Sequence, residues 1–280
     1  MTTRVWLITG ISSGFGRHLA EQLLGRGDRV VGTVRRPETV ADLRDKFPDL
    51  LRVEVLDVRN TEVLRAVVER TVADLGRVDV AINNAGYGVF GAAEEVSDEQ
   101  LEGVLATNLT ACIQLIRAVL PHMRAAGGGR IIQLSSYGGQ VAFAGNSMYH
   151  ATKWGIEGFC ESVAQEVAPF GIGVTIVEPG GARTEFRYGS AQVADPLHAY
   201  VGNPARAFEA MLDPANGLAV GDPARMAAAM IDSVDTEPAP LRMILGSQAL
   251  DSTISTLEAR LANFRTQKAL AASTDYPPGQ

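Results

Sequence analysis

Cysteine is scarce in this sequence: only Cys112 and Cys160, among 280 residues, carry a thiol. Two isolated cysteines build neither a disulfide framework nor a zinc site. Both lie among apolar neighbours in helical patterns, so we interpret them as small buried side chains of a protein in a reducing compartment. We therefore expect a cytoplasmic location and no metal site.

Long apolar runs are also missing. No stretch of about 18 or more apolar residues appears, so we expect no membrane span. The amino terminus enters a strand pattern directly at Val5-Trp6-Leu7-Ile8, without the basic, apolar and small-residue order of a signal peptide. Basic residues are not in excess, because the net charge is −7, and we expect no attraction to nucleic acid or to anionic membranes.

What the sequence does contain is a regular alternation of short apolar runs and helical patterns. Hydrophobic residues make up 46% and charged residues 20%, which suits a globular protein with a sizeable core. Strands are expected at residues 4–9, 30–34, 51–56, 78–82, 130–134, 173–177 and 241–245. The alternation predicts an α/β fold with a doubly wound parallel sheet of about seven strands and helices on both faces. We expect one domain over residues 1–280.

Two regions depart from the alternation. Residues 185–222 carry Pro196, Pro204 and Pro214 with scattered aromatic side chains, which indicates an irregular substrate lid. The last part of the chain, residues 250–280, is expected to form a C-terminal helix and a tail. Helices elsewhere are expected at residues 17–24, 38–46, 61–75, 98–125, 147–168 and 226–234.

A glycine-rich turn follows the first expected strand and precedes a helix. It reads Gly10-Ile11-Ser12-Ser13-Gly14-Phe15-Gly16. Strand, glycine turn and helix form the context of a dinucleotide site, because glycines let the backbone approach a pyrophosphate and the helix supplies free N–H groups. The turn alone is a weak signal, since such turns also occur for structural reasons.

The end of the second strand indicates which dinucleotide binds. An acidic side chain there would bind a free ribose 2′-hydroxyl, whereas an arginine suits a 2′-phosphate. No Asp or Glu occupies this position, and the residues are Arg35 and Arg36. Arg35 therefore favours NADP(H) over NAD(H), and Arg36 is the second candidate for the same phosphate contact. The alternative interpretation is a solvated surface arginine.

Two further strand ends carry candidate cofactor contacts. The third strand ends in Asp57-Val58, where the carboxylate could accept a hydrogen bond from an adenine amino group or cap the helix at 61–75. The fourth strand leads into Asn84-Ala85-Gly86, whose small residues let the chain pass close to a cofactor. Asn108, in the middle of a helical pattern, is unfavourable there and indicates a side chain or a local distortion with another role.

Tyr149 and Lys153 stand four residues apart in a helical pattern, so they share one helix face. A free tyrosine titrates near pH 10, and a neighbouring ammonium lowers that pKa. The pair therefore predicts a general acid-base that exchanges a proton with an alcohol or ketone oxygen. His150 lies about 100° around the same helix and is expected to face away from this site.

Jointly, the motifs over roughly residues 4–184 resemble those of the classical short-chain dehydrogenase/reductase family. They follow the family order and spacing: Thr9-Gly10-x-x-x-Gly14-x-Gly16, Asp57-Val58, Asn83-Asn84-Ala85-Gly86, Asn108, Ser136, Tyr149-x-x-x-Lys153 and Pro179-Gly180-x-x-x-Thr184. The resemblance implies a Rossmann-type fold, an NAD(P)(H) cofactor and interconversion of an alcohol and a carbonyl group.

The resemblance also implies roles for the catalytic set. Tyr149 would protonate the carbonyl oxygen during reduction, and Lys153 would lower its pKa and bind the nicotinamide ribose. Ser136 would hydrogen-bond the substrate oxygen, and the neighbouring Ser135 is the alternative candidate for this role. Asn108 would hold a water that links Lys153 to solvent.

The remaining implied contacts are with the cofactor. Thr184 would fix the nicotinamide carboxamide, and Pro179 and Gly180 would lie beside it. Phe15 departs from the family pattern, which has a smaller aliphatic residue at this place, and could alter packing under the pyrophosphate.

Alternatives to a ketone or aldehyde reductase remain at this stage. The chain could be an NAD-dependent alcohol dehydrogenase, a catalytically silent dinucleotide-binding regulator, or a nucleotide-sugar epimerase or dehydratase. Epimerases use a different glycine spacing, and a pure binder needs neither Ser136 nor the Tyr149 hydroxyl. The aliphatic lid favours an apolar cyclic or polyketide-like ketone as the small-molecule substrate, while fatty-acyl and sugar substrates stay open.

The helices at 107–124 and 147–168 are apolar on more than one face, as buried or interface helices are. The family resemblance implies a homodimer or homotetramer formed on these helices. A monomer is the alternative.

Overall fold

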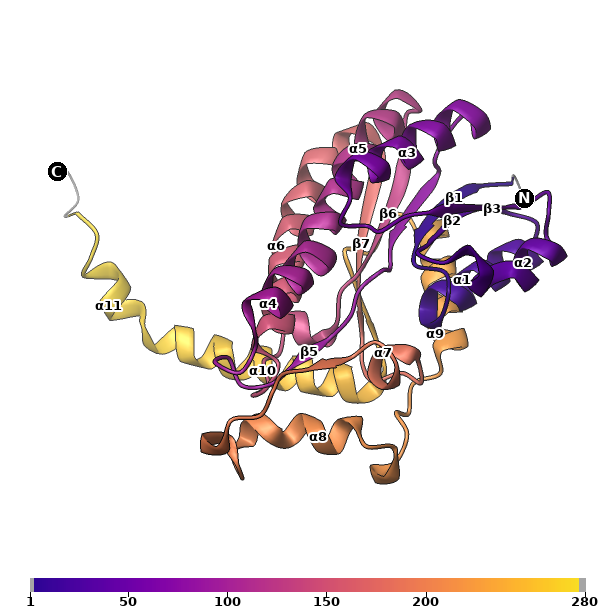
Figure 1. The fold of residues 1–280 in the computed structure, drawn as a ribbon. Coiled ribbons are helices and arrows are strands. Elements are labelled where there is room, and N and C mark those ends of the chain that lie inside the picture. Colours follow the sequence, from indigo (N-terminus) through magenta and orange to yellow (C-terminus); the bar gives the residue numbers. More distant parts are fainter. Residues whose placement is uncertain (1–2, 277–280) are drawn as a thin grey trace.

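A single parallel sheet forms the centre of the protein. The computed structural model describes residues 3–276, and its strands lie in the order β3-β2-β1-β4-β6-β7-β9 (Figure 1). These strands are β1 (Val5–Thr9), β2 (Arg29–Val34), β3 (Leu51–Val55), β4 (Val80–Asn83), β6 (Gly129–Leu134), β7 (Ile172–Pro179) and β9 (Arg242–Leu245). All pair in parallel, so the prediction of a doubly wound sheet of about seven strands is confirmed.

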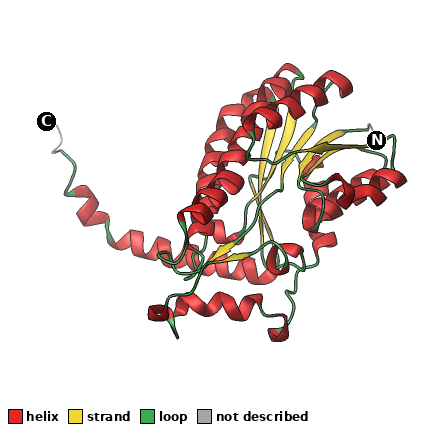
Figure 2. Ribbon diagram, in the orientation of Figure 1, coloured by secondary structure: helices red, strands yellow, loops and turns green. Residues whose placement is uncertain are grey.

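Helices cover both faces of this sheet (Figure 2). One face carries α1 (Gly14–Gly25), α2 (Ala41–Lys46) and α9 (Pro223–Asp232), and the other carries α3 (Thr61–Leu75), α5 (Ala111–Ala125) and α6 (Ser147–Val167). Each face buries its own apolar cluster, with Trp6 and Ile8 on one side and Leu7 and Val31 on the other. The alternation of side chains along a strand produces this division.

The strand order reverses between β1 and β4, which lie side by side in the sheet. Parallel sheets bind ligands in the crevice outside the carboxyl ends of their strands at such a point. The glycine turn follows β1, and Asn84-Ala85-Gly86 follows β4, so the topology brings these two predicted segments together.

The helical run around Asn108 is not continuous α-helix. Helix α4 (Asp98–Leu105) and α5 are joined by a π-helical turn, Ala106–Thr110, with Asn108 buried in it. This confirms the expected local distortion. Such a turn widens the helix by one residue and re-aims its side chains, and it is frequent at functional sites.

The combined run Asp98–Ala125 is long and apolar enough, by length and composition, to cross a membrane. This differs from the sequence expectation, which considered only unbroken apolar runs. In the fold the run packs on the sheet through Leu115, Ile116, Val119 and Met123, and 39% of its most apolar window is buried. The core helix of a globular protein passes the same test, so the run is weak evidence for a membrane span.

The predicted lid is irregular, as expected, but a small second sheet anchors it. Strand β8 (Gln192–Val193) pairs in parallel with β5 (Val89–Phe90). Short helices α7 (Glu185–Tyr188) and α8 (Ala207–Leu212) complete the lid. Helix α10 (Ser247–Thr266) begins beneath the body, and its far end and α11 (Lys268–Ala272) lie away from it (Figure 1).

Candidate active site

A cleft of about 1150 Å³ opens at the carboxyl ends of the strands, between the sheet and the lid. Most of the side chains predicted from sequence line it: Gly10, Ser12, Ser13, Gly14, Phe15, Arg35, Asp57, Val58, Asn84, Ala85, Gly86, Ser136, Tyr149, Lys153, Pro179, Gly180 and Thr184. The predicted residues absent from its lining are Gly16, Arg36 and Asn108. The sequence motifs therefore converge on one place in the fold.

The glycine turn forms one end of the cleft. Gly10 and Gly14 adopt positive φ angles of 73° and 55°, which favour glycine. Helix α1 begins at Gly14, and no side chain caps its first N–H groups. The first turn of a helix leaves such donors without intrahelical partners, and here they adjoin the cleft. This end of the cleft is therefore suited to an anionic pyrophosphate.

Gly16 has a packing role beneath the turn. A β-carbon on Gly16 would lie 2.1 Å from the carbonyl oxygen of Gly10 and 2.5 Å from the Asn84 amide nitrogen. That amide donates hydrogen bonds to the carbonyls of Thr9 and Gly10, at 2.9 and 2.8 Å. Asn84 thus ties the end of β4 to the glycine turn, and only glycine fits at position 16 between them.

Basic side chains gather at the end of β2. Arg35 is exposed and lines the cleft, whereas Arg36 is exposed but does not. Arg59 also lines the cleft and forms a bidentate ion pair with Asp57, which lowers the pKa of that carboxyl group. Asn60, rather than Asp57, caps α3 by accepting a hydrogen bond from the Val63 N–H. The capping alternative for Asp57 was therefore wrong.

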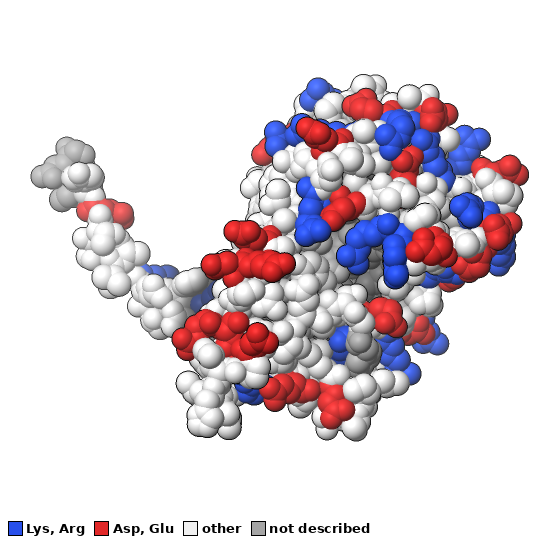
Figure 3. Space-filling view, in the orientation of Figure 1, with Lys and Arg blue, Asp and Glu red and all other residues white. Residues whose placement is uncertain are grey.

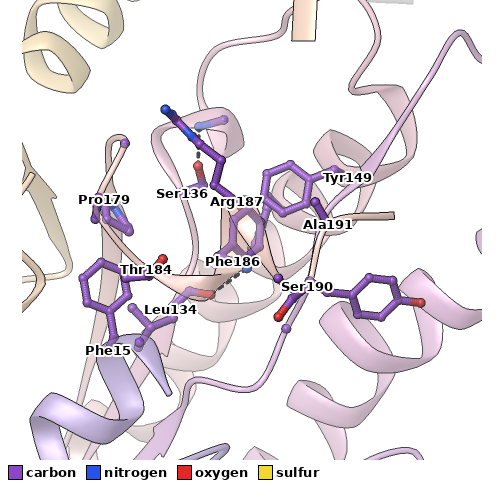
Figure 4. Close-up of a pocket in the computed structure, with 18 of the residues that line it drawn as sticks. Phe15, Leu134, Ser136, Tyr149, Pro179, Thr184, Phe186, Arg187, Ser190 and Ala191 are labelled. Carbon is purple, nitrogen blue, oxygen red and sulfur yellow. Dashed lines mark hydrogen bonds between the residues drawn. The ribbon is translucent and has the colours of Figure 1, made fainter. Parts of the chain in front are cut away.

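Tyr149, Ser136 and Lys153 meet on the opposite wall. Ser136 interacts with the Tyr149 hydroxyl in a way that lowers the pKa of the phenol. The Ser136 hydroxyl also accepts the Gly138 N–H at 3.1 Å (Figure 4). Lys153 lies one turn along α6, and its ammonium donates to the carbonyl of Leu134 over 2.9 Å. All three side chains are more than nine-tenths buried. The predicted i, i+4 pair thus shares one face of α6 and one wall of the cleft.

The choice between the two serines is clear from their partners. Ser135 donates its hydroxyl hydrogen bond to Glu157 over 2.6 Å, behind the wall. Ser136 is the serine that contacts the Tyr149 hydroxyl. This arrangement supports Ser136 as the one that reaches a substrate oxygen.

The pKa of Tyr149 differs from the sequence expectation. Burial raises it to about 12, and the hydrogen bond with Ser136 only partly opposes this effect. The Lys153 nitrogen lies 5.6 Å from the centre of the Tyr149 ring, and burial lowers the pKa of Lys153 itself. The expected lowering of the Tyr149 pKa by Lys153 was therefore wrong for this structure, because both groups are desolvated. The phenol is protonated at neutral pH.

Asn108 acts on the surrounding backbone. Its side-chain oxygen accepts the Tyr87 N–H at 3.1 Å, and its amide donates to the Tyr87 carbonyl at 2.8 Å and towards the Thr152 hydroxyl at 3.4 Å. The π-helical turn aims the amide at these groups. Asn108 therefore links the segment after β4 to the helix that carries Lys153, and its role in holding a water stays a prediction.

Aromatic side chains that the sequence did not single out form the lid side of the cleft. The ring of Phe186 lies 5.6 Å from that of Tyr149, centre to centre (Figure 4). Phe143 and Phe208 also line the cleft, and Phe208 stacks on Phe90 at 5.8 Å. Phe186 and Phe208 come from the irregular lid, where no periodicity marks a residue as inward-facing.

His150 does not face away, so that expectation was wrong. It is buried, lines the cleft, and accepts a long hydrogen bond of 3.4 Å from the Phe143 N–H through Nδ1. A β-carbon on Gly138 would lie 3.1 Å from its ring, so the 3₁₀ turn Tyr137–Gly139 packs directly on it. Burial lowers the pKa of His150 to about 4, which leaves the ring neutral at pH 7.

Known proteins share this architecture. A family model described as short chain dehydrogenase matches residues 4–193. Oxidoreductase BOA17 of Botryotinia fuckeliana is 38% identical over 254 residues, which cover 89% of this chain and 91% of that protein. The crystal structure of a short-chain dehydrogenase from Streptomyces avermitilis has a TM-score of 0.92 and 40% identity, over 98% of this chain and all of that one.

A more distant structure contains a bound dinucleotide. The gluconate 5-dehydrogenase from Burkholderia cenocepacia, solved in complex with NADP and tartrate, has a TM-score of 0.74 and 25% identity, over 90% of this chain and 96% of that one. The family match covers strands β1 to β8, together with the glycine turn and the Tyr149 helix. This chain belongs to the short-chain dehydrogenase/reductase family of oxidoreductases.

Proposed function

We propose that this protein is an NADP(H)-dependent oxidoreductase that reduces a ketone or aldehyde to an alcohol, and catalyses the reverse reaction, with Tyr149 as general acid-base. The observation that carries the proposal is that Tyr149, Ser136 and Lys153 share the wall of a cleft that also contains the glycine turn. A regulator that only bound a dinucleotide would not need this hydroxyl pair.

Different side chains of the cleft bind the cofactor and the substrate in this proposal. NADPH, when bound, supplies the hydride. The glycine turn and the start of α1 hold the pyrophosphate, and the two remaining donors of the Lys153 ammonium are available for the ribose hydroxyls. Thr184, packed beside Gly14, is placed for the nicotinamide end. Ser136 and Tyr149 together orient the substrate oxygen.

The raised pKa of Tyr149 suits the reductive direction. A phenol that is protonated at neutral pH can donate its proton to the oxygen that gains negative charge as hydride arrives at the carbonyl carbon. Oxidation of an alcohol needs the phenolate, which forms at higher pH. We therefore propose reduction as the favoured direction near neutrality and oxidation at alkaline pH.

The preference for NADP(H) rests on Arg35. Its guanidinium lines the cleft just past β2, where a doubly wound sheet meets the adenosine ribose. A guanidinium binds phosphate through paired, charge-assisted hydrogen bonds. The NADP complex of the Burkholderia cenocepacia structure supports the same choice.

The substrate end of the cleft favours an apolar, uncharged carbonyl compound. Phe90, Phe143, Phe186, Phe208 and Met211 contribute to its walls, and His150 beside them is neutral. Burying an apolar molecule against such walls is favourable.

The test is cofactor binding followed by a carbonyl panel. Nicotinamide fluorescence of the purified protein should show tight NADPH and weak NADH, and NADPH should then be consumed with apolar ketones in preference to ionised ones. Preference for NADH would overturn the cofactor assignment. Binding of NADPH without turnover of any carbonyl compound would favour the regulator.

A further inference from the structure

His150 carries a polar atom in the wall of the cleft, close to the reacting groups. The residue is only 7% exposed, and it follows Tyr149 directly in α6. Its burial keeps the imidazole neutral, so one ring nitrogen carries a hydrogen and the other carries a lone pair. The position of that hydrogen decides what the ring can offer to a ligand.

A backbone group fixes the position of the hydrogen. The Phe143 N–H donates to Nδ1 over 3.4 Å, so Nδ1 holds the lone pair and Nε2 carries the hydrogen. Among the groups that the structure describes, none accepts a hydrogen bond from Nε2. This nitrogen is also not one of the enclosed polar atoms that lack a partner, such as Glu178 Oε2. Nε2 therefore opens onto the cleft as a donor.

The ring is held in place from several sides. The Phe143 ring lies 5.7 Å away and the Tyr149 ring 6.1 Å away, centre to centre, with tilts of 53° and 51°. Gly138 packs on the third side, because a β-carbon there would lie 3.1 Å from both Cδ2 and Nε2. A donor whose orientation is already fixed loses little freedom when it binds a ligand.

The Nε2 donor lies beside the groups that would bind the reacting carbonyl. The same β-carbon position on Gly138 is 3.4 Å from Ser136 Oγ, so Nε2 and the Ser136 hydroxyl border one small space. A substrate with its carbonyl oxygen at Ser136 and Tyr149 can therefore reach His150 with a second polar group. The neighbouring rings of Phe143 and Phe186 offer no donor for such a group.

A purely structural role does not account for an imidazole at this position. A phenylalanine ring could pack on Gly138 and would bury no ring nitrogen. The Nε2 hydrogen loses its hydration when a ligand covers it, and this costs free energy unless the ligand supplies an acceptor. The donor therefore discriminates between ligands that have an acceptor at this place and ligands that do not.

We propose that His150 selects the substrate by donating a hydrogen bond from Nε2 to an oxygen atom other than that of the reacting carbonyl group. This inference rests on the proposed function and narrows its substrate class. The substrate is an uncharged carbonyl compound with a largely apolar skeleton and a second oxygen acceptor, an ether, hydroxyl or carbonyl oxygen, across a ring or a short chain from the first. His150 binds the substrate and takes no part in proton transfer.

The test compares two ketones that differ at one atom. 4-Propoxycyclohexanone has an ether oxygen where 4-butylcyclohexanone has a methylene group. Isothermal titration calorimetry measures the dissociation constant of each ketone with the full-length protein in the presence of NADP⁺, which has no hydride to transfer. A purely apolar wall would bind the butyl ketone more tightly. We expect wild type to bind the ether ketone at least as tightly.

Three variants identify the donor. His150→Phe should shift the ratio of the two dissociation constants about fivefold or more in favour of the butyl ketone. His150→Gln also lacks Nδ1 but keeps an N–H donor of similar reach, so it should retain most of the wild-type ratio. Tyr137→Phe removes a hydroxyl from the same wall and should leave the ratio unchanged. Circular dichroism checks that each variant is folded.

An equal ratio in wild type and His150→Phe, equal losses for both ketones, or binding of neither ketone would overturn the inference. A shift in Tyr137→Phe in place of His150→Phe would assign the contact to the Tyr137 hydroxyl and overturn it as well. Reduction of the same ketones by NADPH tests the proposed function separately. Selectivity that depends on His150 without turnover would support this inference and contradict the proposed reaction. Turnover with the same selectivity in wild type and His150→Phe would overturn only the inference.

Discussion

The guanidinium of Arg242 in β9 binds the carboxylate of Glu178, whose side chain is completely buried. The same guanidinium binds Glu157, which lies one turn beyond Lys153 on α6. Oε2 of Glu178 has no hydrogen-bond partner among residues 3–276. Two buried carboxylates thus share one cation behind the wall of the cleft, and the exposed Glu161 is a third partner of the same guanidinium.

This arrangement predicts a pH dependence of stability. Burial, and then the charge of Glu157, raise the pKa of Glu178 above its usual value. The folded protein therefore binds this proton more tightly than the unfolded chain does. Its contribution to the unfolding free energy is fully present below the unfolded pKa of about 4.3 and is lost as the pH rises through the folded pKa.

Other carboxylates change the unfolding free energy in the opposite direction as the pH rises. The effect of Glu178 is therefore obtained as the difference between wild type and a variant that lacks its carboxyl group. Urea unfolding of wild type and Glu178→Gln, at several pH values between 4.5 and 8, should show the difference in unfolding free energy changing with pH. Glu161→Gln, which removes an exposed partner of the same arginine, serves as the control. Parallel curves for wild type and Glu178→Gln would show that this proton is not linked to folding.

Replacement of Tyr149 tests the chemistry. Tyr149→Phe keeps the ring and removes the proton donor, so kcat for ketone reduction should fall about 10²–10⁴-fold. NADPH affinity should stay within a factor of about two, because no donor to the cofactor is lost. Tyr137→Phe removes another hydroxyl from the same cleft and should keep most activity. Near-normal turnover by Tyr149→Phe would contradict the assignment.

Replacement of Arg35 tests cofactor selection. A charged hydrogen bond contributes about 1.5–3 kcal/mol, so Arg35→Ala should weaken NADPH binding about 10- to 100-fold and leave NADH nearly unchanged. Arg36→Ala, one residue away and outside the cleft, should alter neither. Equal losses for the two dinucleotides would show that Arg35 does not distinguish them. Fluorescence titration measures all of these affinities.

Glu95 provides a test of the lid. Its side chain is completely buried, accepts the N–H groups of Ala92 and Leu197 at 2.7 and 2.8 Å, and binds Arg206 of the lid. Glu95→Ala leaves that arginine without this buried partner, so the lid should loosen and KM for an apolar ketone should rise about tenfold.

Limited proteolysis gives the lid prediction a second readout. Cleavage within residues 195–212 should be faster in Glu95→Ala than in wild type. Glu209→Ala is the control, because Glu209 is an exposed second partner of Arg206 at 3.7 Å. Unchanged KM and unchanged cleavage would show that Glu95 does not hold the lid.

The parts predicted from sequence were those specified by local spacing. The glycine turn is recognisable because a strand and a helix flank it, and Tyr149 and Lys153 because four residues make one helical turn. The seven strands could be located because parallel strands buried on both faces are continuous apolar runs.

The parts that sequence did not reveal depend on contacts between distant residues. Glu95 and Arg206 are 111 positions apart, and nothing local marks either as a partner of the other. Strands β5 and β8 have two residues each, too short for any periodicity. The orientation of His150 was predicted wrongly, because its angular position on α6 gives no information about the 3₁₀ turn that packs on its ring.

The pairing of β5 with β8 determines how substrates enter and leave. Gln192 and Ala194 donate to the carbonyls of Gly88 and Phe90, so this side of the lid is fastened to the segment that follows Gly86. The opposite side of the lid carries the exposed Leu218 and Val220. This side is also tied to the body, because Gly221 forms a bridge with Ala182 and the Arg183 guanidinium donates to the Ala219 carbonyl. We therefore expect the lid to pivot about β8 and Gly221, with the residues between them moving to admit the ketone. Because the pivot adjoins the cofactor wall, dinucleotide binding and lid closure should be linked, which in steady-state kinetics means ordered addition with the cofactor first.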